Sequence, residues 1–144
     1  MQQRHLREII AGGKLVSVDG NTTVVEAARV MTQSRIGALV VMHGNNIEGI
    51  FSERDVVNRV VARGLDPKST SVYDVMTTPV ITAGPETKAI DALRTMQESG
   101  FRHLPVCDDG HPLGVVSLRD FLGAEMAEVQ DEISFEHAIE EELW

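Results

Sequence analysis

The sequence has little cysteine and no long apolar run. Cys107 is the single cysteine, so no disulfide can form within the chain. The longest apolar runs, such as Ala38 to Met42, are far shorter than the roughly 20 residues that cross a bilayer. The first residues, Met1 to His5, lack the apolar core of a signal peptide. We therefore expect a cytoplasmic protein with an inert, buried Cys107 thiol.

The common motifs of catalysis and phosphate binding are also missing. The sequence contains no Gly-x-Gly-x-x-Gly and no Gly-x-x-x-x-Gly-Lys-Ser/Thr segment. It shows no recognisable Ser/His/Asp or Cys/His constellation. His137 and Glu141 have helical i, i+4 spacing, but a single pair without a third ligand is a weak metal signal. We expect neither an enzyme, nor a metal site, nor a covalently bound cofactor.

Lysine and arginine are absent from positions 124–144, which carry eight acidic residues. The formal net charge of -9 is concentrated there, because the remaining 123 residues have 14 acidic against 13 basic side chains. The nearly neutral body does not repel an anionic ligand. The acidic tail argues against nucleic acid and against anionic membrane surfaces as partners. A chain of 144 residues is long enough for one compact domain with a real core.

The sequence does contain an internal repeat. An offset of 65 residues aligns the two copies without a gap, and the clearest match closes each copy. Gly-Ile-Phe-Ser-Glu-Arg-Asp at 49–55 lies over Gly-Val-Val-Ser-Leu-Arg-Asp at 114–120. Such a repeat predicts two similar units related by an approximate two-fold axis. A site built at Asp55 is then expected, in some form, at Asp120.

Each copy reads as strand, helix, strand, strand, helix, which predicts an α/β (α+β) fold. The expected elements are 15–18, 24–33, 38–42, 47–51 and 53–62 in the first copy, and 81–82, 87–98, 102–107, 113–117 and a helix from about 118 in the second. Thr23 and Glu26 form a capping-box signature, and Gly37 is expected to break the first helix. We divide the chain into an N-terminal helix with the first repeat (1–62), a connector with a helical turn at 72–76 (63–79), the second repeat (80–123) and an acidic helical tail (124–144).

The tail has its own apolar pattern. A helical stripe with a spacing of four, three and four is formed by Leu122, Met126, Val129 and Ile133. Ser134 is expected to restart a second helix that carries Phe135, Ile139 and Leu143. Two interpretations are open: the stripe covers the core of its own domain, or it packs across a homodimer.

The closing motif of each copy places a serine before a helix and an aspartate three residues later. Ser52 with Asp55, and Ser117 with Asp120, have the spacing of a capping pair, so one interpretation is only structural. The other is a binding site, because a helix N-terminus favours phosphate and a carboxylate accepts hydrogen bonds from ribose hydroxyls. Arg54 and Arg119 would then either contact phosphate or lie in solvent.

These features resemble a pair of cystathionine-β-synthase (CBS) domains, also called a Bateman module. The resemblance rests on Phe-Arg-His-Leu-Pro-Val at 101–106 and on the two Gly-h-h-Ser-x-x-Asp endings, where h is apolar. It covers roughly residues 7–123, and the layout with a short acidic tail resembles small stand-alone bacterial pairs. It implies two β-α-β-β-α repeats packed sheet to sheet, face-to-face homodimers, and two clefts that bind adenine nucleotides: AMP, ADP, ATP, S-adenosylmethionine or NAD(H).

The resemblance also implies site residues, the aspartate taking the ribose and the serine reaching phosphate or ribose. For cleft 1 these are Val16, Ser17, Val18, Ile36, Gly37, Ala38, Leu39, Ser52, Arg54 and Asp55. For cleft 2 they are Ile81, Thr82, Ala83, Arg102, His103, Leu104, Pro105, Ser117, Arg119 and Asp120.

The two copies differ where phosphate would be held. Arg102 and His103 stand where the first copy has Gly37 and Ala38, so we expect cleft 2 to suit a phosphorylated ligand better. His103 would either donate to phosphate or pack beside Leu104. The resulting hypothesis is a non-catalytic regulatory module that senses an adenine nucleotide for a client protein as yet unidentified. The alternative is a structural dimerisation module whose clefts are filled by side chains.

Overall fold

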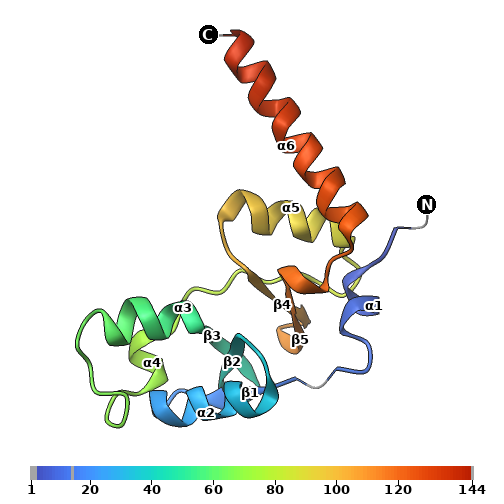
Figure 1. Cartoon of the computed structure of the whole chain (residues 1–144). Coiled ribbons are helices and arrows are strands. Elements are labelled where there is room, and N and C mark those ends of the chain that lie inside the picture. The colour runs from blue at the N-terminus through green and yellow to red at the C-terminus, as the bar shows by residue number, and fades with distance from the viewer. Residues whose placement is uncertain (1–2, 14, 144) are drawn as a thin grey trace.

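The computed structural model describes residues 3–13 and 15–143 of the chain (Figure 1). It is a mixed α/β structure with two small sheets and a long C-terminal helix. The first part contains α1 (Leu6–Ile10), β1 (Ser17–Asp19), α2 (Val24–Ser34), β2 (Ala38–His43), β3 (Asn46–Ser52) and α3 (Glu53–Asp55), which continues as a π-helical segment (Val56–Val61). The second part contains α4 (Val72–Val75), α5 (Ala89–Ser99), β4 (His103–Asp108), β5 (His111–Ser117), a 3₁₀ turn (Leu118–Asp120) and α6 (Gly123–Leu143).

The two sheets repeat one pattern, and β3 of the first lies against β5 of the second. In the first sheet, β1 pairs in parallel with β2 and β2 pairs antiparallel with β3. In the second, β4 and β5 are antiparallel, and the strand expected at 81–82 is reduced to one parallel bridge between Ala83 and Val106. Pro79 and Pro85 flank this segment, and proline cannot donate to a ladder, which keeps the pairing short.

Helix ends differ from the sequence-based expectation in two places. The Thr23 hydroxyl caps α2 as predicted, accepting a hydrogen bond from the Glu26 amide at 3.3 Å. The helix is ended by Arg35, which adopts the left-handed conformation (φ 55°), and the prediction that Gly37 ends it is wrong. The predicted restart at Ser134 is also wrong, because α6 is one continuous helix from Gly123 to Leu143.

The hydrophobic cores cross the repeat boundary. Leu6 of α1 is fully buried among Leu93, Leu104 and other residues of the second repeat. Val72 and Val75 of α4 are buried in the core of the first repeat. The helix that precedes each repeat therefore completes the core of the other repeat, although the sequence grouped the N-terminal helix with the first. This exchange joins the two halves into one packed body.

Two glycines allow these helices to approach the sheets. A Cβ at Gly49 would run into the Met76 sulfur at the end of α4 and lie 3.0 Å from the Thr77 carbonyl oxygen. The matching position in the second repeat, Gly114, would place a Cβ 3.2 Å from the Ile10 side chain. The repeated glycine of the closing motif is thus explained by packing against the exchanged helix.

The first part of the tail packs on its own domain. Val129 is buried, and Met126 and Ile133 pack on the core of the second repeat, whereas Leu122 stays half exposed (51%). Beyond Ile133 the helix extends away from the body, and Phe135 and Ile139 are exposed (Figure 1). None of the helices in the described part of the chain is both long and apolar enough to cross a membrane.

Candidate ligand clefts between the repeats

Two clefts open where the repeats meet, each around one closing-motif aspartate. The Asp55 cleft has a volume of about 270 Å³. It is lined by Asp55 with Gly37, Ile50, Ser52, Glu53, Arg54, Asn58, Arg59, Thr77, Phe101, Arg102 and His103. The Asp120 cleft has a volume of about 470 Å³. It is lined by Asp120 with Arg35, Ile36, Gly37, Ala38, His103, Val115, Ser117 and Arg119.

Each cleft combines residues of both repeats. Asp120 faces the beginning of β2, where Ile36, Gly37 and Ala38 lie. Asp55 shares its cleft with Phe101 and Arg102, which precede β4. Gly37, expected in cleft 1, and His103, expected in cleft 2, each line both clefts. The structure thus places the start of β2 beside Asp120 and the residues before β4 beside Asp55. The resemblance had assigned each aspartate the strand of its own repeat.

The carboxylate of Asp55 is buried and occupied by hydrogen bonds within the protein. Its Oδ2 accepts from the Ser52 amide (3.0 Å) and hydroxyl (3.2 Å), and its Oδ1 accepts from the Thr77 hydroxyl (3.0 Å). The Arg59 Nε lies 3.5 Å from the same Oδ1. Both oxygens therefore have partners, which is what a buried carboxylate requires.

Asp120 makes the same motif contact but keeps one oxygen open. Its Oδ2 accepts from the Ser117 amide at 2.7 Å and from the Ser117 hydroxyl at 3.3 Å. Among the described residues, no side chain or amide donates to Oδ1, and the residue is exposed at the cleft. The capping interpretation is thus correct for both pairs, and at Asp120 it leaves an acceptor available to a ligand.

The arginines of the two clefts are also used differently. In the Asp55 cleft, Arg59 donates to the Met76 carbonyl (2.8 Å) and Arg54 to the Gly100 carbonyl (3.4 Å). In the Asp120 cleft, the side chains of Arg35 and Arg119 make no hydrogen bond or ion pair with any residue that the structure describes. The Asp120 cleft therefore offers two uncommitted guanidinium groups beside one carboxylate.

His103 lies between the two clefts, and its side chain reaches across to the first repeat. A Cβ at Gly37 would be 3.2 Å from the His103 Nε2, so the glycine leaves room for the imidazole. Burial lowers the pKa of His103 below its ordinary value, and the charges of Arg119 and Arg102 lower it further against the opposing effect of Glu53 and Asp120. The lowered pKa favours the neutral imidazole, which can both donate and accept.

Several predicted residues lie away from the cleft linings. Leu39, Leu104 and Pro105 are buried within their strands. Ser17 and Val18 lie in β1 at the sheet edge and Val16 directly precedes it. The segment Ile81, Thr82 and Ala83 takes the matching place beside β4. In the described structure these six residues line neither cleft. Cys107 is half buried next to this segment, and burial raises the pKa of its thiol, which makes it less reactive.

The lining residues that the sequence did not predict include Arg35, Arg59 and Thr77. Arg35 is the helix-ending residue of α2 and has no recognisable motif. Arg59 lies one turn after Asp55, a spacing that predicts an i, i+4 ion pair. Thr77 belongs to the connector and is brought to Asp55 only by the packing of α4.

Comparison with known proteins finds the same fold and family. The chain is 36% identical over 128 residues to the CBS domain-containing protein CBSX3, mitochondrial, of Arabidopsis thaliana; the match covers 85% of this chain and 62% of that protein, so the chain spans less than two-thirds of this relative's length. The crystal structure of the CBS domain protein PAE2072 from Pyrobaculum aerophilum, complexed with AMP, has a TM-score of 0.78 and 26% identity, covering 89% of this chain and 99% of that one. The hexameric CBS-CP12 protein from bloom-forming cyanobacteria has a TM-score of 0.74 and 30% identity, covering 83% of this chain and 70% of that one.

A family model also covers most of the chain. The model described as the CBS domain matches twice, at residues 6–62 and 72–127. The second match begins at α4 and the first at α1, so each takes in the helix that packs on the opposite repeat. The two matches, the doubled strand pattern and the paired clefts show that this chain belongs to the CBS domain family and consists of a tandem CBS pair.

Proposed function

We propose that this CBS pair is a regulatory module that binds an adenine nucleotide in the Asp120 cleft and catalyses no reaction. The observation that carries the proposal is the unoccupied Oδ1 of Asp120 in a cleft of about 470 Å³. Asp120 is held at Oδ2 by its own serine, so Oδ1 is left to accept from a ribose hydroxyl. A hydrogen bond to a charged acceptor contributes about 1.5–3 kcal/mol.

The surrounding charges suit the rest of such a ligand. Arg35 and Arg119 approach the cleft from opposite repeats and present two guanidinium groups, the side chains best shaped for phosphate. Neutral His103 adds a donor between them. The AMP complex of the similar Pyrobaculum protein supports the choice of an adenine nucleotide. AMP, ADP, ATP and NAD(H) share the adenosine and phosphate that these groups would contact.

The Asp55 cleft is assigned a mainly structural role. Ser52, Thr77 and Arg59 already bond its carboxylate, so a ribose would have to replace these contacts. For the first half alone, these contacts favour the second candidate function, a structural role without a bound ligand. We expect one high-affinity nucleotide per chain and a much weaker second site.

We also propose that the chain works as a cytoplasmic homodimer. Apolar side chains are exposed on the π-helical segment, at Val57 (59%) and Val61 (68%), and on α6, at Phe135 (67%). A second copy would remove such surface from water. The hexameric CBS-CP12 neighbour supports self-association in general, and sedimentation velocity would give the number of copies.

Isothermal titration calorimetry with AMP, ADP, ATP, NAD, NADH and S-adenosylmethionine tests the proposal. At least one ligand should bind near one per chain and raise the melting temperature. A ligand present at a hundred times its Kd stabilises the folded state by about 2.7 kcal/mol. Incubation of ATP with magnesium and the protein should leave the nucleotide intact. No binding by the whole panel would contradict the proposal and favour the dimerisation module; nucleotide turnover would contradict the non-catalytic assignment.

A further inference from the structure

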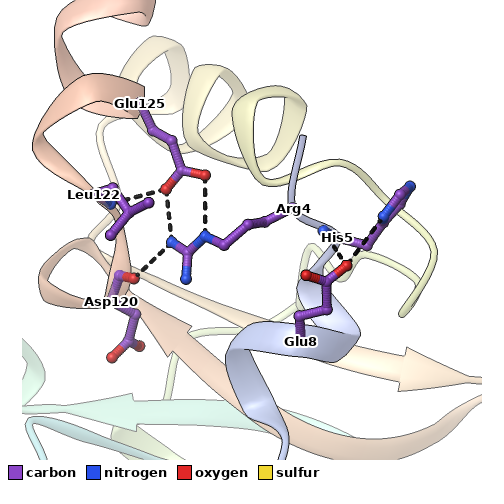
Figure 2. Close-up of polar contacts among 6 residues, drawn as sticks. All are labelled: Arg4, His5, Glu8, Asp120, Leu122 and Glu125. Atoms are coloured by element: carbon purple, nitrogen blue, oxygen red, sulfur yellow. Dashed lines mark hydrogen bonds and ion pairs between the residues drawn. The ribbon is translucent and has the colours of Figure 1, made fainter. Parts of the chain in front are cut away.

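We propose that Arg4, from the N-terminal segment, is a positioning residue for the Asp120 cleft. The inference rests on the proposed function only where it concerns ligand affinity. Arg4 Nη2 donates to the backbone carbonyl of Asp120 at 3.2 Å (Figure 2). Figure 2 also shows the Asp120 carboxylate pointing away from Arg4, so the guanidinium holds the backbone and leaves the side chain to the cleft.

Arg4 is itself held by a bidentate ion pair. Its Nη2 and Nε donate to the two carboxylate oxygens of Glu125, at 2.7 and 3.2 Å. Glu125 is buried (7% exposed) in the first turn of α6, and its Oε1 also accepts from the Leu122 amide at 2.8 Å. The Glu125 carboxylate therefore links Arg4 to Leu122, which lies two positions after Asp120. Charge-assisted bidentate pairs of this kind fix geometry well.

The backbone of Arg4 is anchored on the second repeat. The Ala89 amide donates to the Arg4 carbonyl at 2.8 Å, and the next residues continue the contact, with the Leu6 amide donating to the Thr87 carbonyl at 2.9 Å. Leu6 is fully buried in the second core. The guanidinium is thus presented from a fixed support and does not belong to a loose terminus.

The turn that carries Asp120 needs an external support. After Asp55 the chain continues into the π-helical segment, whose backbone bonds hold the aspartate in a longer helix. After Asp120 the 3₁₀ turn ends at once, Phe121 is extended, and the closing bond from the Phe121 amide to the Leu118 carbonyl is long at 3.4 Å. Ser117 holds the turn through the Asp120 carboxylate, and Arg4 holds it through the Asp120 backbone carbonyl. This is why an arginine 116 residues away in sequence is needed beside the Asp120 cleft.

The chain offers matched controls for this role. Arg7 of α1 pairs with Glu86 at 2.9 Å, but both side chains are about two-thirds exposed, and in the described part of the chain neither is hydrogen-bonded to Asp120. Arg7→Met therefore removes an arginine and an ion pair from the same helix region without touching the turn. Arg4→Lys keeps a positive charge beside Glu125 but cannot also reach the Asp120 carbonyl through a fork of donors.

Two measurements test the proposal. In the ligand-free protein, Arg4→Met should increase amide hydrogen exchange at Asp120, Phe121 and Leu122 by about tenfold or more, and Arg7→Met should not. In the second, AMP affinity is measured by calorimetry in a cycle of native protein, Arg4→Met, Asp120→Asn and the double variant. Arg4→Met should weaken AMP about fivefold or more in the native background and less than twofold when Asp120 is already Asn.

The outcomes separate a positioning role from mere stability. Arg4→Lys should recover most of the lost melting temperature but little of the lost AMP affinity. Equal losses in both backgrounds, or full recovery of affinity by lysine, would overturn the proposal. If native protein binds none of the nucleotides in the panel, the proposed function fails while the exchange measurement still decides the role of Arg4: unchanged exchange at 120–122 overturns it, and increased exchange supports it.

Discussion

The same seven-residue closing motif has two different outcomes in this molecule. In the first half, Asp55 is buried and both carboxylate oxygens are bonded by the protein. In the second half, Asp120 repeats the serine contact at one oxygen and leaves the other open at a larger cleft. A repeated motif therefore specifies a local cap, and the residues that reach it from elsewhere decide whether it is also available to a ligand.

Those residues differ between the halves in a way the repeat makes visible. At the 65-residue offset, the position of Arg59 is taken by Ala124 in the second half. After α1 the chain has Gly12 where the segment after α4 has Thr77. The second half therefore lacks both side chains that complete the Asp55 network, and it has Arg4 at the backbone instead. The proposed function therefore gives Asp55 a structural role and Asp120 the binding role.

The largest expected effect is on nucleotide affinity. Asp120→Ala should weaken AMP binding by about tenfold to a hundredfold, since hydrogen bonds to a charged acceptor contribute about 1.5–3 kcal/mol each. Calorimetry measures the loss, and a melting curve controls for the lost cap, which costs about 0.5–2 kcal/mol. Asp55→Ala, the matched variant, should change affinity less than about threefold. Equal effects of the two variants would remove the distinction between the clefts.

The second-largest expected effect is a loss of stability when Asp55, in the first half, is replaced. Asp55→Ala leaves the Thr77 hydroxyl and the Ser52 amide without their acceptor in a buried site, which costs about 1–3 kcal/mol. Asp120→Ala should cost less, because its residue is exposed and water replaces the carboxylate. Urea unfolding of both variants gives the two values. A larger loss for Asp120→Ala would contradict the structural role of Asp55.

The packing beneath the two clefts predicts a smaller asymmetry. Gly49→Ala brings a methyl group against Met76 and the Thr77 backbone, so we expect a loss of about 1–3 kcal/mol from overpacking. Gly114→Ala places the new methyl group 3.2 Å from the Ile10 Cβ and Cγ2, so α1 needs to move by only a few tenths of an ångström, and the change should cost less than about 1 kcal/mol. Unfolding curves in urea test the order, and the reverse order would show that α1 is held more rigidly than α4.

The smallest expected effect is on the number of protons taken up when AMP binds. Burial lowers the pKa of His103, so the folded protein loses stability as the pH falls from about 6.5 towards the lower folded pKa. A bound phosphate beside the imidazole would favour its charged form, so AMP binding near pH 6.5 should take up a fraction of a proton. Calorimetry in buffers of different ionisation enthalpy measures this uptake. His103→Gln should abolish its histidine part, and unchanged uptake in that variant would place the phosphate elsewhere.

Much of the fold followed from pattern alone. The gapless repeat predicted two similar units, the apolar runs predicted β2, β3, β4 and β5 to within a few residues, and Thr23 marked the start of α2. The errors have local causes. Arg35 ends α2 in a left-handed conformation that no glycine announces, and Ser134 sits inside a continuous α6.

The candidate site was less accessible to sequence reasoning. The two Ser-x-x-Asp pairs were found because they repeat, and His103 because it differs between the copies. Arg35 lines the Asp120 cleft from the first repeat. Thr77 contacts Asp55, and Arg4 contacts Asp120, from 22 and 116 positions away in the sequence. Such contacts depend on where whole helices pack, which short motifs do not encode.

The sequence by itself determined the duplication, the strand and helix order, and the two capped aspartates, because these depend on residue periodicity and on bonds spanning three or four positions. Only the tertiary structure decided that α1 and α4 exchange partners between the repeats. That exchange delivers Thr77 to Asp55 and Arg4 to the backbone of Asp120. The physical reason is that a carboxylate takes its hydrogen bonds from whatever donors packing brings within about 3 Å, wherever they lie along the chain.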